Sequence, residues 1–190
     1  MLKKYNFRQT IELIQEDLRA EGITKLLSLK AFKAFMVSPT TRYKLYLRLG
    51  AFMKGKKMWC YPIIFLFYRH LKYKTGIQIR MDTQIEGGLH FIHFGDIVIN
   101  ANAKIGKNCT IFNGVTIGAS KLGGCAPEIG NNVCLCVGAK LIGNIKISNN
   151  VIVGAGAVVV KDVPDNAVVA GVPAKIISME GDKEHMVWRR

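Results

Sequence analysis

The sequence predicts a mainly β fold, a parallel β-helix of six-residue repeats preceded by a short α-helical N-terminal segment. The first observation behind this prediction is a period of six in the aliphatic and aromatic residues after residue 76. The second is a composition boundary near Gly76, where a strongly basic segment gives way to a nearly neutral one. We therefore expect a basic helical segment at 1–76, a β-helix at 77–177 and a C-terminal tail at 178–190.

The segment 1–76 has the spacing of helices and most of the net charge. Apolar residues recur at helical intervals at Phe7, Ile11, Ile14 and Leu18. Ser38-Pro39 marks a break followed by a helix start, so we expect two or three helices before the first coil. The segment holds 16 Lys and Arg against 4 Asp and Glu, a net of +12 within the chain's +14.

The repeats after residue 76 are spaced by six with two exceptions. The step from Ile97 to Ile105 is eight, and the step from Ile117 to Ile129 is twelve. A period of six fits neither an α-helix nor simple alternation, but it fits a short strand followed by a tight turn. Three such units close one triangular coil, and stacked coils bury a continuous aliphatic column. The repeat positions are Ile79, Ile85, Phe91, Ile97, Ile105, Ile111, Ile117, Ile129, Leu135, Leu141, Ile147, Val153 and Val159.

Several classes of protein are disfavoured by composition. The five cysteines are odd in number and contain no CxxC pair, which favours a reducing, cytoplasmic location and no metal site. The N-terminus does not have the pattern of a signal peptide, and the longest apolar run, Trp59 to Tyr68, is too short to span a bilayer. No nucleic-acid-binding motif accompanies the positive charge, so we expect no nucleic acid partner.

Motifs in the repeat region resemble the serine acetyltransferase branch of the hexapeptide acyltransferases. They are Val115–Gly118, Ile142–Ile145, Gly154–Val159, Val163-Pro164 and the closing Ala170–Lys175, AGVPAK. The resemblance covers about residues 76–177. It implies a left-handed β-helix, acetyl-CoA as co-substrate, no metal, and a homotrimer whose active sites lie between subunits.

The resemblance also assigns roles to residues. The family's catalytic histidine falls on His93, which would act as general base on the acceptor hydroxyl, a task suited to an imidazole that titrates near neutrality. We expect His90, three residues earlier, to be structural. The pantetheine arm and phosphates of the cofactor would lie beside small residues and two lysines: Gly118, Ala119, Gly138, Ala139, Gly154, Ala155, Lys161 and Lys175.

The sequence departs from serine acetyltransferases at the expected acceptor site. Gln78 replaces an aspartate that orients the histidine, Ile92 replaces a second aspartate, and the insertion 118–128 contains no histidine. Because an amino acid acceptor needs partners for its charged groups, we expect a sugar hydroxyl of a surface polysaccharide or its precursor. Asp82 and Asp96 are further groups that could orient His93.

Other functions stay open beside this one. The first alternative is a serine O-acetyltransferase of cysteine biosynthesis, and the second is a non-catalytic β-helix that serves as a scaffold or binding module. A zinc enzyme on the same fold would need three histidines, whereas the coils contain only His90 and His93.

The two ends of the chain suggest which partners to expect. The resemblance implies no complex with cysteine synthase, because Val187–Arg190 replaces the family's docking isoleucine. The basic, aromatic segment 1–76 could contact an anionic membrane, and the chain would then lie at the inner, cytoplasmic face of that membrane.

Overall fold

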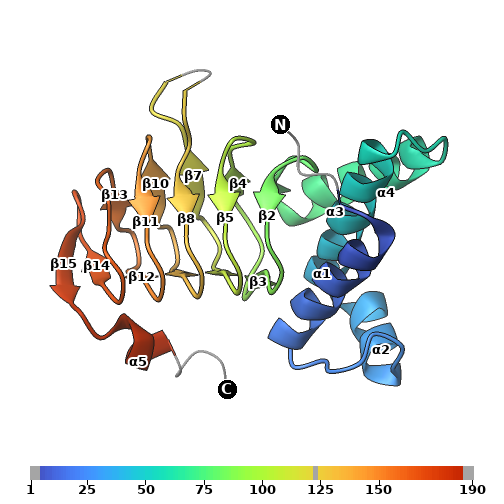
Figure 1. The fold of residues 1–190 in the computed structure, drawn as a ribbon, viewed down its shortest axis with the longest axis horizontal. Helices are drawn as coiled ribbons and strands as arrows, with labels where there is room; N and C mark the ends of the chain where they lie inside the picture. Colours follow the sequence, from blue (N-terminus) through green and yellow to red (C-terminus); the bar gives the residue numbers. More distant parts are fainter. Residues whose placement is uncertain (1–4, 122–123, 186–190) are drawn as a thin grey trace.

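The computed structural model describes residues 5–121 and 124–185, and it begins with helices (Figure 1). Their bounds are α1 Phe7–Ala20, α2 Leu29–Val37, α3 Pro39–Gly55 and α4 Tyr61–Thr75. The expectation of two or three helices was too low, because it missed α2. The side chain of Ser28 accepts a hydrogen bond from the Ala31 N–H and starts α2, and Ser38 starts α3 in the same way.

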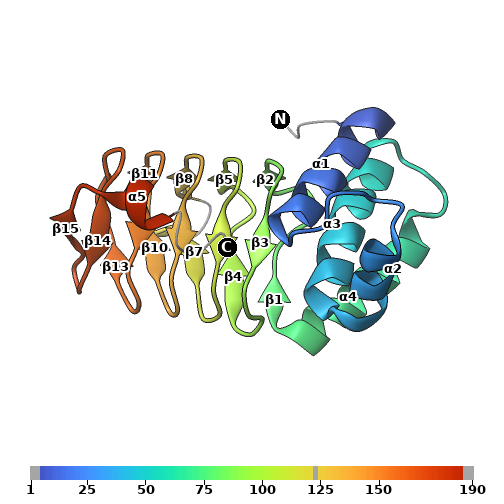
Figure 2. The same ribbon diagram turned by 90° about the horizontal axis from the view of Figure 1, so that it is seen from below.

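The chain from Ile77 to Ala170 winds into coils of parallel strands, which confirms the predicted β-helix (Figures 1 and 2). Three successive strands, one from each sheet, make one coil. The left-handed sense of the coils stays a prediction from the resemblance. Sheet A contains β1 (Ile77–Gln78), β4 (Ile97–Ile99), β7 (Thr116–Gly118), β10 (Lys140–Ile142) and β13 (Val158–Val159). Sheet B contains β2 (Gln84–Ile85), β5 (Lys104–Ile105), β8 (Glu128–Ile129) and β11 (Lys146–Ile147). Sheet C contains β3 (His90–Phe91), β6 (Thr110–Ile111), β9 (Cys134–Leu135), β12 (Ile152–Val153), β14 (Val168–Ala170) and β15 (Lys175–Ser178).

The pairing register corrects one detail of the expected repeat. Ile99, and not Ile97, is the partner of Ile117 in the next coil. The eight-residue step therefore runs from Phe91 to Ile99, and the step from Ile99 to Ile105 is six. The two extra residues lie in the corner between β3 and β4, and this corner contains His93.

The corners between sheets B and C are built from stacked asparagines. Asn108, Asn132, Asn150 and Asn166 have φ values of 57°, 55°, 56° and 61°. Asparagine tolerates this left-handed conformation better than most residues do. Each side-chain amide donates to the carbonyl oxygen of the next asparagine, at 3.1, 3.0 and 2.9 Å. This ladder joins successive coils along one edge, outside the buried aliphatic column.

A buried ion pair fixes helices α1 and α3 to the first coil. Arg48 of α3 donates to both carboxylate oxygens of Asp17 of α1, at 2.9 and 3.1 Å, and also to two backbone carbonyls of the first coil. Asp17 in turn accepts the Leu89 N–H at 2.8 Å. Lys44 beside it pairs with Glu21 at 2.7 Å and donates to the Leu89 carbonyl. The helices therefore pack as one unit with the coil that carries both histidines.

The last segment closes the end of the β-helix that lies far from the helices (Figure 1). Strand β15 pairs antiparallel with β14, and the short helix α5 (Gly181–His185) folds back against the asparagine edge, where the Gly181 N–H donates to the Asn166 carbonyl. The tail residues Val187–Arg190, on which we based the absence of a cysteine synthase complex, lie outside the described residues. None of the described helices is long and apolar enough to cross a membrane.

Candidate active site

His93 lies on the edge between sheets C and A, in the corner enlarged by two residues. Its side chain is exposed, and its ring meets the ring of Phe112 edge to face with centroids 6.3 Å apart. Phe112 follows β6 and so lies in the same corner of the next coil. The enlarged corner thus presents an imidazole at the surface on a rigid stack of coils, as a general base requires.

The end of α4 packs against this corner and is hydrogen-bonded to it. Gly76 ends α4 in the left-handed conformation, with φ 66°, and its carbonyl accepts the Ile97 N–H at 3.2 Å. A Cβ atom at Gly76 would lie 3.1 Å from the backbone nitrogen of Asp96. Gly76 is therefore more than the composition boundary expected from the sequence, and a glycine after a helical run is the signal that predicts such a left-handed cap.

Of the groups considered as partners for His93, Gln78 lies near its corner and Asp82 does not. Asp82 lies at the other end of β1, between sheets A and B, where it bonds Arg80 and Lys54. The hydrogen bond from Arg80 holds the pKa of Asp82 at about 2. Asp82 is thus committed to those cations and lies at a different corner from His93, so the open possibility that it orients His93 finds no support within one chain. Gln78 is exposed on β1 and pairs with Val98 of β4, next to the His93 corner.

The other two residues near His93 occupy different environments. Asp96 is exposed three residues after His93 and has a φ of 51°. His90 lies half-buried in β3 beside Thr110 of the next coil, a position that fits the structural role we expected. Among the residues that the structure describes, none forms a hydrogen bond with the His93 ring, so a ligand or a second subunit could reach it.

The small residues assigned to the cofactor lie on two edges of the β-helix. Gly138, Gly154 and Ala155 lie on the same edge as His93, in the coils above it. Gly118 and Ala119 lie where sheet A leads into the insertion, on the next edge. One chain therefore does not bring all of them together, whereas two chains packed side by side could face these two edges toward each other.

Ala139 was wrongly placed in the cofactor groove. Its side chain is 0 % exposed and belongs to the aliphatic core. The corner turns at Gly138, whose φ is 72°, so the next side chain points into the coil. The equivalent corner positions of the two preceding coils, Val115 and Ile97, are buried in the same way, so Ala139 belongs to the core column.

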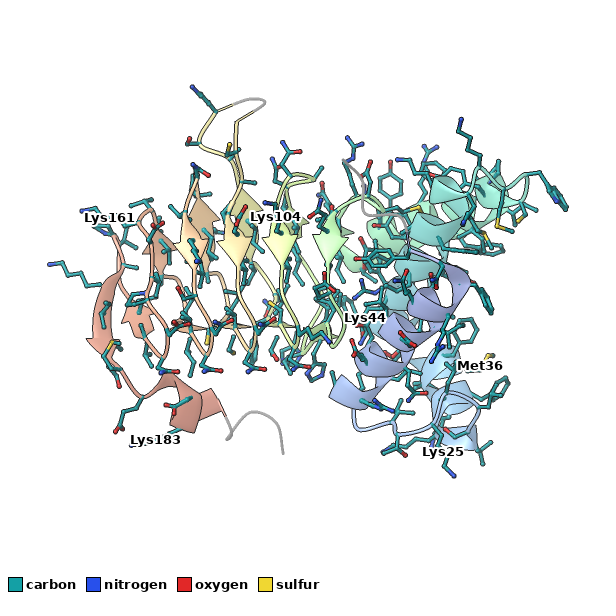
Figure 3. The ribbon with its side chains drawn as sticks, viewed as in Figure 1. Lys25, Met36, Lys44, Lys104, Lys161 and Lys183 are labelled. Carbon is teal, nitrogen blue, oxygen red and sulfur yellow. The ribbon has the colours of Figure 1, made fainter. Side chains whose placement is uncertain are left out.

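The two lysines assigned to the cofactor phosphates lie at the last coil. Lys161 follows β13 and Lys175 begins β15, and both are exposed. Figure 3 shows Lys161 extending into solvent at the end of the β-helix opposite the helices. Both are free to bind an anion, although they are several coils away from His93.

The exposed apolar side chains described after residue 76 form two groups, one on sheet A and its edges and one in the closing segment, where Val172, Ile176, Ile177 and Met179 are exposed. Phe94 and Val137 lie on the His93 edge, Val98 points outward from sheet A, and Val160 follows the last strand of that sheet. On sheet B, in contrast, the outward positions are polar, with Lys104 paired to Glu128. Apolar side chains on one face of a regular solenoid favour contact with another subunit there.

The insertion between β7 and β8 projects from the edge between sheets A and B (Figure 1). At its base Ala126 and Pro127 are buried, whereas Cys125 before them is exposed. The described residues contain no cluster of three or more His, Cys, Asp or Glu that could hold a metal ion.

Comparison with known proteins relates the repeat region to serine acetyltransferases, although no family model matches the chain. The chain is 40% identical over 112 residues to a serine acetyltransferase of Staphylococcus aureus, covering 58% of this chain and 53% of that protein. It is 37% identical over 123 residues to the enzyme of Synechococcus elongatus, covering 63% and 50%. The chain thus spans about half the length of the curated relatives it matches.

Solved structures extend the likeness to the helices. Serine acetyltransferase of Neisseria gonorrhoeae in complex with serine has a TM-score of 0.76 at 28% identity, covering 90% of this chain and 70% of that one. A serine acetyltransferase in complex with CoA has a TM-score of 0.73 at 22% identity and covers 90% and 71%, a likeness of fold alone. The chain is therefore serine acetyltransferase-like in the sequence of its β-helix and in its fold.

Proposed function

We propose that the chain is an acetyl-CoA-dependent O-acetyltransferase in which His93 is the general base. The observation that carries the proposal is an exposed imidazole on a corner enlarged by two residues, in a chain that is 40% identical over 112 residues to a serine acetyltransferase. The small residues Gly138, Gly154 and Ala155 on the same edge leave room for a narrow chain such as pantetheine.

The reaction needs one proton transfer in each direction. His93 takes the proton of the acceptor hydroxyl while that oxygen attacks the carbonyl carbon of the thioester. The carbon–sulfur bond then breaks, and the imidazolium returns the proton to the sulfur of coenzyme A. His93 must therefore be neutral at the start, because only a neutral imidazole can accept the proton.

The active site is complete in a homotrimer under this proposal. The apolar side chains Phe94, Val98, Val137 and Val160 would be covered by a neighbouring β-helix. The edge with Gly118 and Ala119 of one subunit would then face the His93 edge of the next. This arrangement explains why the small residues lie on two edges, and it leaves Lys161 and Lys175 as the groups for the phosphates.

L-Serine is the acceptor that the comparisons favour, ahead of the sugar hydroxyl that we expected from the sequence. The relatives are named serine acetyltransferases, and one of the similar structures contains serine. The sugar acceptor stays the second candidate for a specific reason. Gln78 is not a carboxylate, and the described part of the insertion, 118–121 and 124–128, contains no histidine and a single carboxylate, Glu128, which pairs with Lys104 on sheet B.

An acceptor screen with the full chain tests the proposal. Acetyl-CoA is supplied with L-serine or with a panel of sugars and sugar nucleotides, and free thiol is measured over the hydrolysis rate without acceptor. Turnover with L-serine at a millimolar or lower Michaelis constant would assign the serine reaction. Turnover with a sugar alone would assign the sugar reaction, and coenzyme A binding without any turnover would leave a non-catalytic binding module.

A further inference from the structure

The helical end of the molecule exposes an unusual amount of apolar surface. The exposed side chains come from α2 with the residues before it and from α4 with the loop before it. We call them the helical-end surface: Leu27, Leu29, Phe32, Met36, Val37, Trp59, Ile63, Leu66, Phe67 and Tyr73. On α4, Ile63, Leu66 and Phe67 have the spacing of one helix face, which differs from the face of the buried Tyr68 and Leu71. This helix therefore has an apolar face toward its exterior as well as toward the core.

The two halves of the helical-end surface are joined by aromatic contacts. The ring of Tyr46 on α3 stacks on that of Phe67 on α4, with centroids 5.7 Å apart and an angle of 9° between the rings. The centroid of the same ring lies 6.4 Å from that of Phe35 on α2. Figure 3 shows Met36 and Lys25 at the end of the molecule away from the β-helix. The exposed apolar residues of α2 and α4 thus belong to one surface.

The charge around this surface has a single sign. Residues 22–81 contain 13 Lys and Arg and no Asp or Glu. Four of these cations, Lys44, Arg48, Lys54 and Arg80, bond acidic side chains outside that range. The other nine have no acidic partner among the residues that the structure describes. Lys56 and Lys57 lie three and two residues before Trp59, whose side chain is 87 % exposed.

We propose that the helical-end surface binds an anionic lipid membrane peripherally. Exposed apolar and Trp side chains among uncompensated lysines match the boundary between headgroups and acyl chains. A second copy of this chain is a poorer occupant, because two such surfaces would bring like charges together without an acidic partner. The proposal concerns binding only and does not rest on the acetyltransferase function.

Sedimentation of the full chain with vesicles tests this inference. Vesicles of phosphatidylcholine alone are compared with vesicles that also contain phosphatidylglycerol, at low and high salt. Lys56→Gln/Lys57→Gln should lower the partition constant on anionic vesicles roughly 25-fold, since each basic residue contributes about fivefold. Leu66→Gln should lower it roughly tenfold through lost apolar burial.

Matched controls are available at the other end of the molecule. Lys146 is exposed on β11 and Ile177 is exposed on β15. Lys146→Gln and Ile177→Gln should leave vesicle binding unchanged.

Three outcomes would overturn the proposal. One is the absence of binding to anionic vesicles, and another is an equal loss of binding in the control variants. The third is a particle of twice the trimer mass that dissociates in Leu66→Gln without any lipid binding, which would make the surface an interface between copies.

Discussion

Removing the Asp17 carboxylate should weaken the attachment of α1 and α3 to the first coil and so destabilise the fold. In Asp17→Ala, Arg48 loses both of its bonds to the carboxylate, and the buried Leu89 N–H loses its acceptor. Breaking a buried ion pair by removing one partner costs about 3–5 kcal/mol, because the remaining charge stays buried and uncompensated. For a chain of this size, such a loss corresponds to a fall in melting temperature of roughly 6–20 °C.

The assay is thermal and urea unfolding at one protein concentration, since subunit association also affects apparent stability. The matched control is Glu12→Ala on the same helix, because Glu12 pairs with Arg8 on the surface and such pairs contribute about 0–1 kcal/mol. Asp17→Leu/Arg48→Met should recover part of the loss, since it leaves no unpaired charge. A loss below about 1 kcal/mol in Asp17→Ala would refute the view that this pair joins helices and coil.

The remaining predictions concern three other positions. Gly76→Ala should destabilise the protein by about 1–2 kcal/mol because of its left-handed backbone, whereas Gly55→Ala, with open space around it, should be neutral or slightly stabilising. A melting temperature in Gly76→Ala equal to that of the native chain would contradict the supporting role of that residue. Because Asp82 has a folded-state pKa of about 2 against an ordinary 3.8, its contribution to stability is complete above about pH 4 and is lost as pH falls toward 2. Acid titrations of unfolding should show this loss in the native chain and not in Asp82→Asn. Ala139→Leu should lower stability through overpacking by about 1–3 kcal/mol, and a stable variant that fails only to bind acetyl-CoA would return Ala139 to the cofactor groove.

The repeat region was predictable because its determinants are local and periodic. Apart from the twelve-residue step at the insertion, the positions from Ile105 to Val159 repeat every six residues, and each points into the same column. The same rule misplaced the eight-residue step, because both Ile97 and Ile99 are buried in β4 and the sequence does not distinguish them. Only the pairing of Ile99 with Ile117 fixes the register.

The junction with the helices could not be predicted from the sequence. Asp17 and Leu89 are 72 positions apart, and no periodicity connects them. The role of Ala139 was misread for a related reason, since a small residue at a corner is compatible both with a ligand groove and with the buried core. The direction of the Ala139 side chain depends on the left-handed backbone at Gly138, and the identity of residue 139 does not reveal it.

The central claim is that His93 is the base of an acetyl transfer, and one comparison tests it most directly. Turnover of acetyl-CoA with the best acceptor is measured for the native chain, for His93→Ala and for His70→Ala, an exposed histidine on α4. We predict a loss of roughly a hundredfold or more in His93→Ala, with unchanged acetyl-CoA affinity and melting temperature, and no change in His70→Ala. A folded His93→Ala enzyme with native turnover would contradict the account.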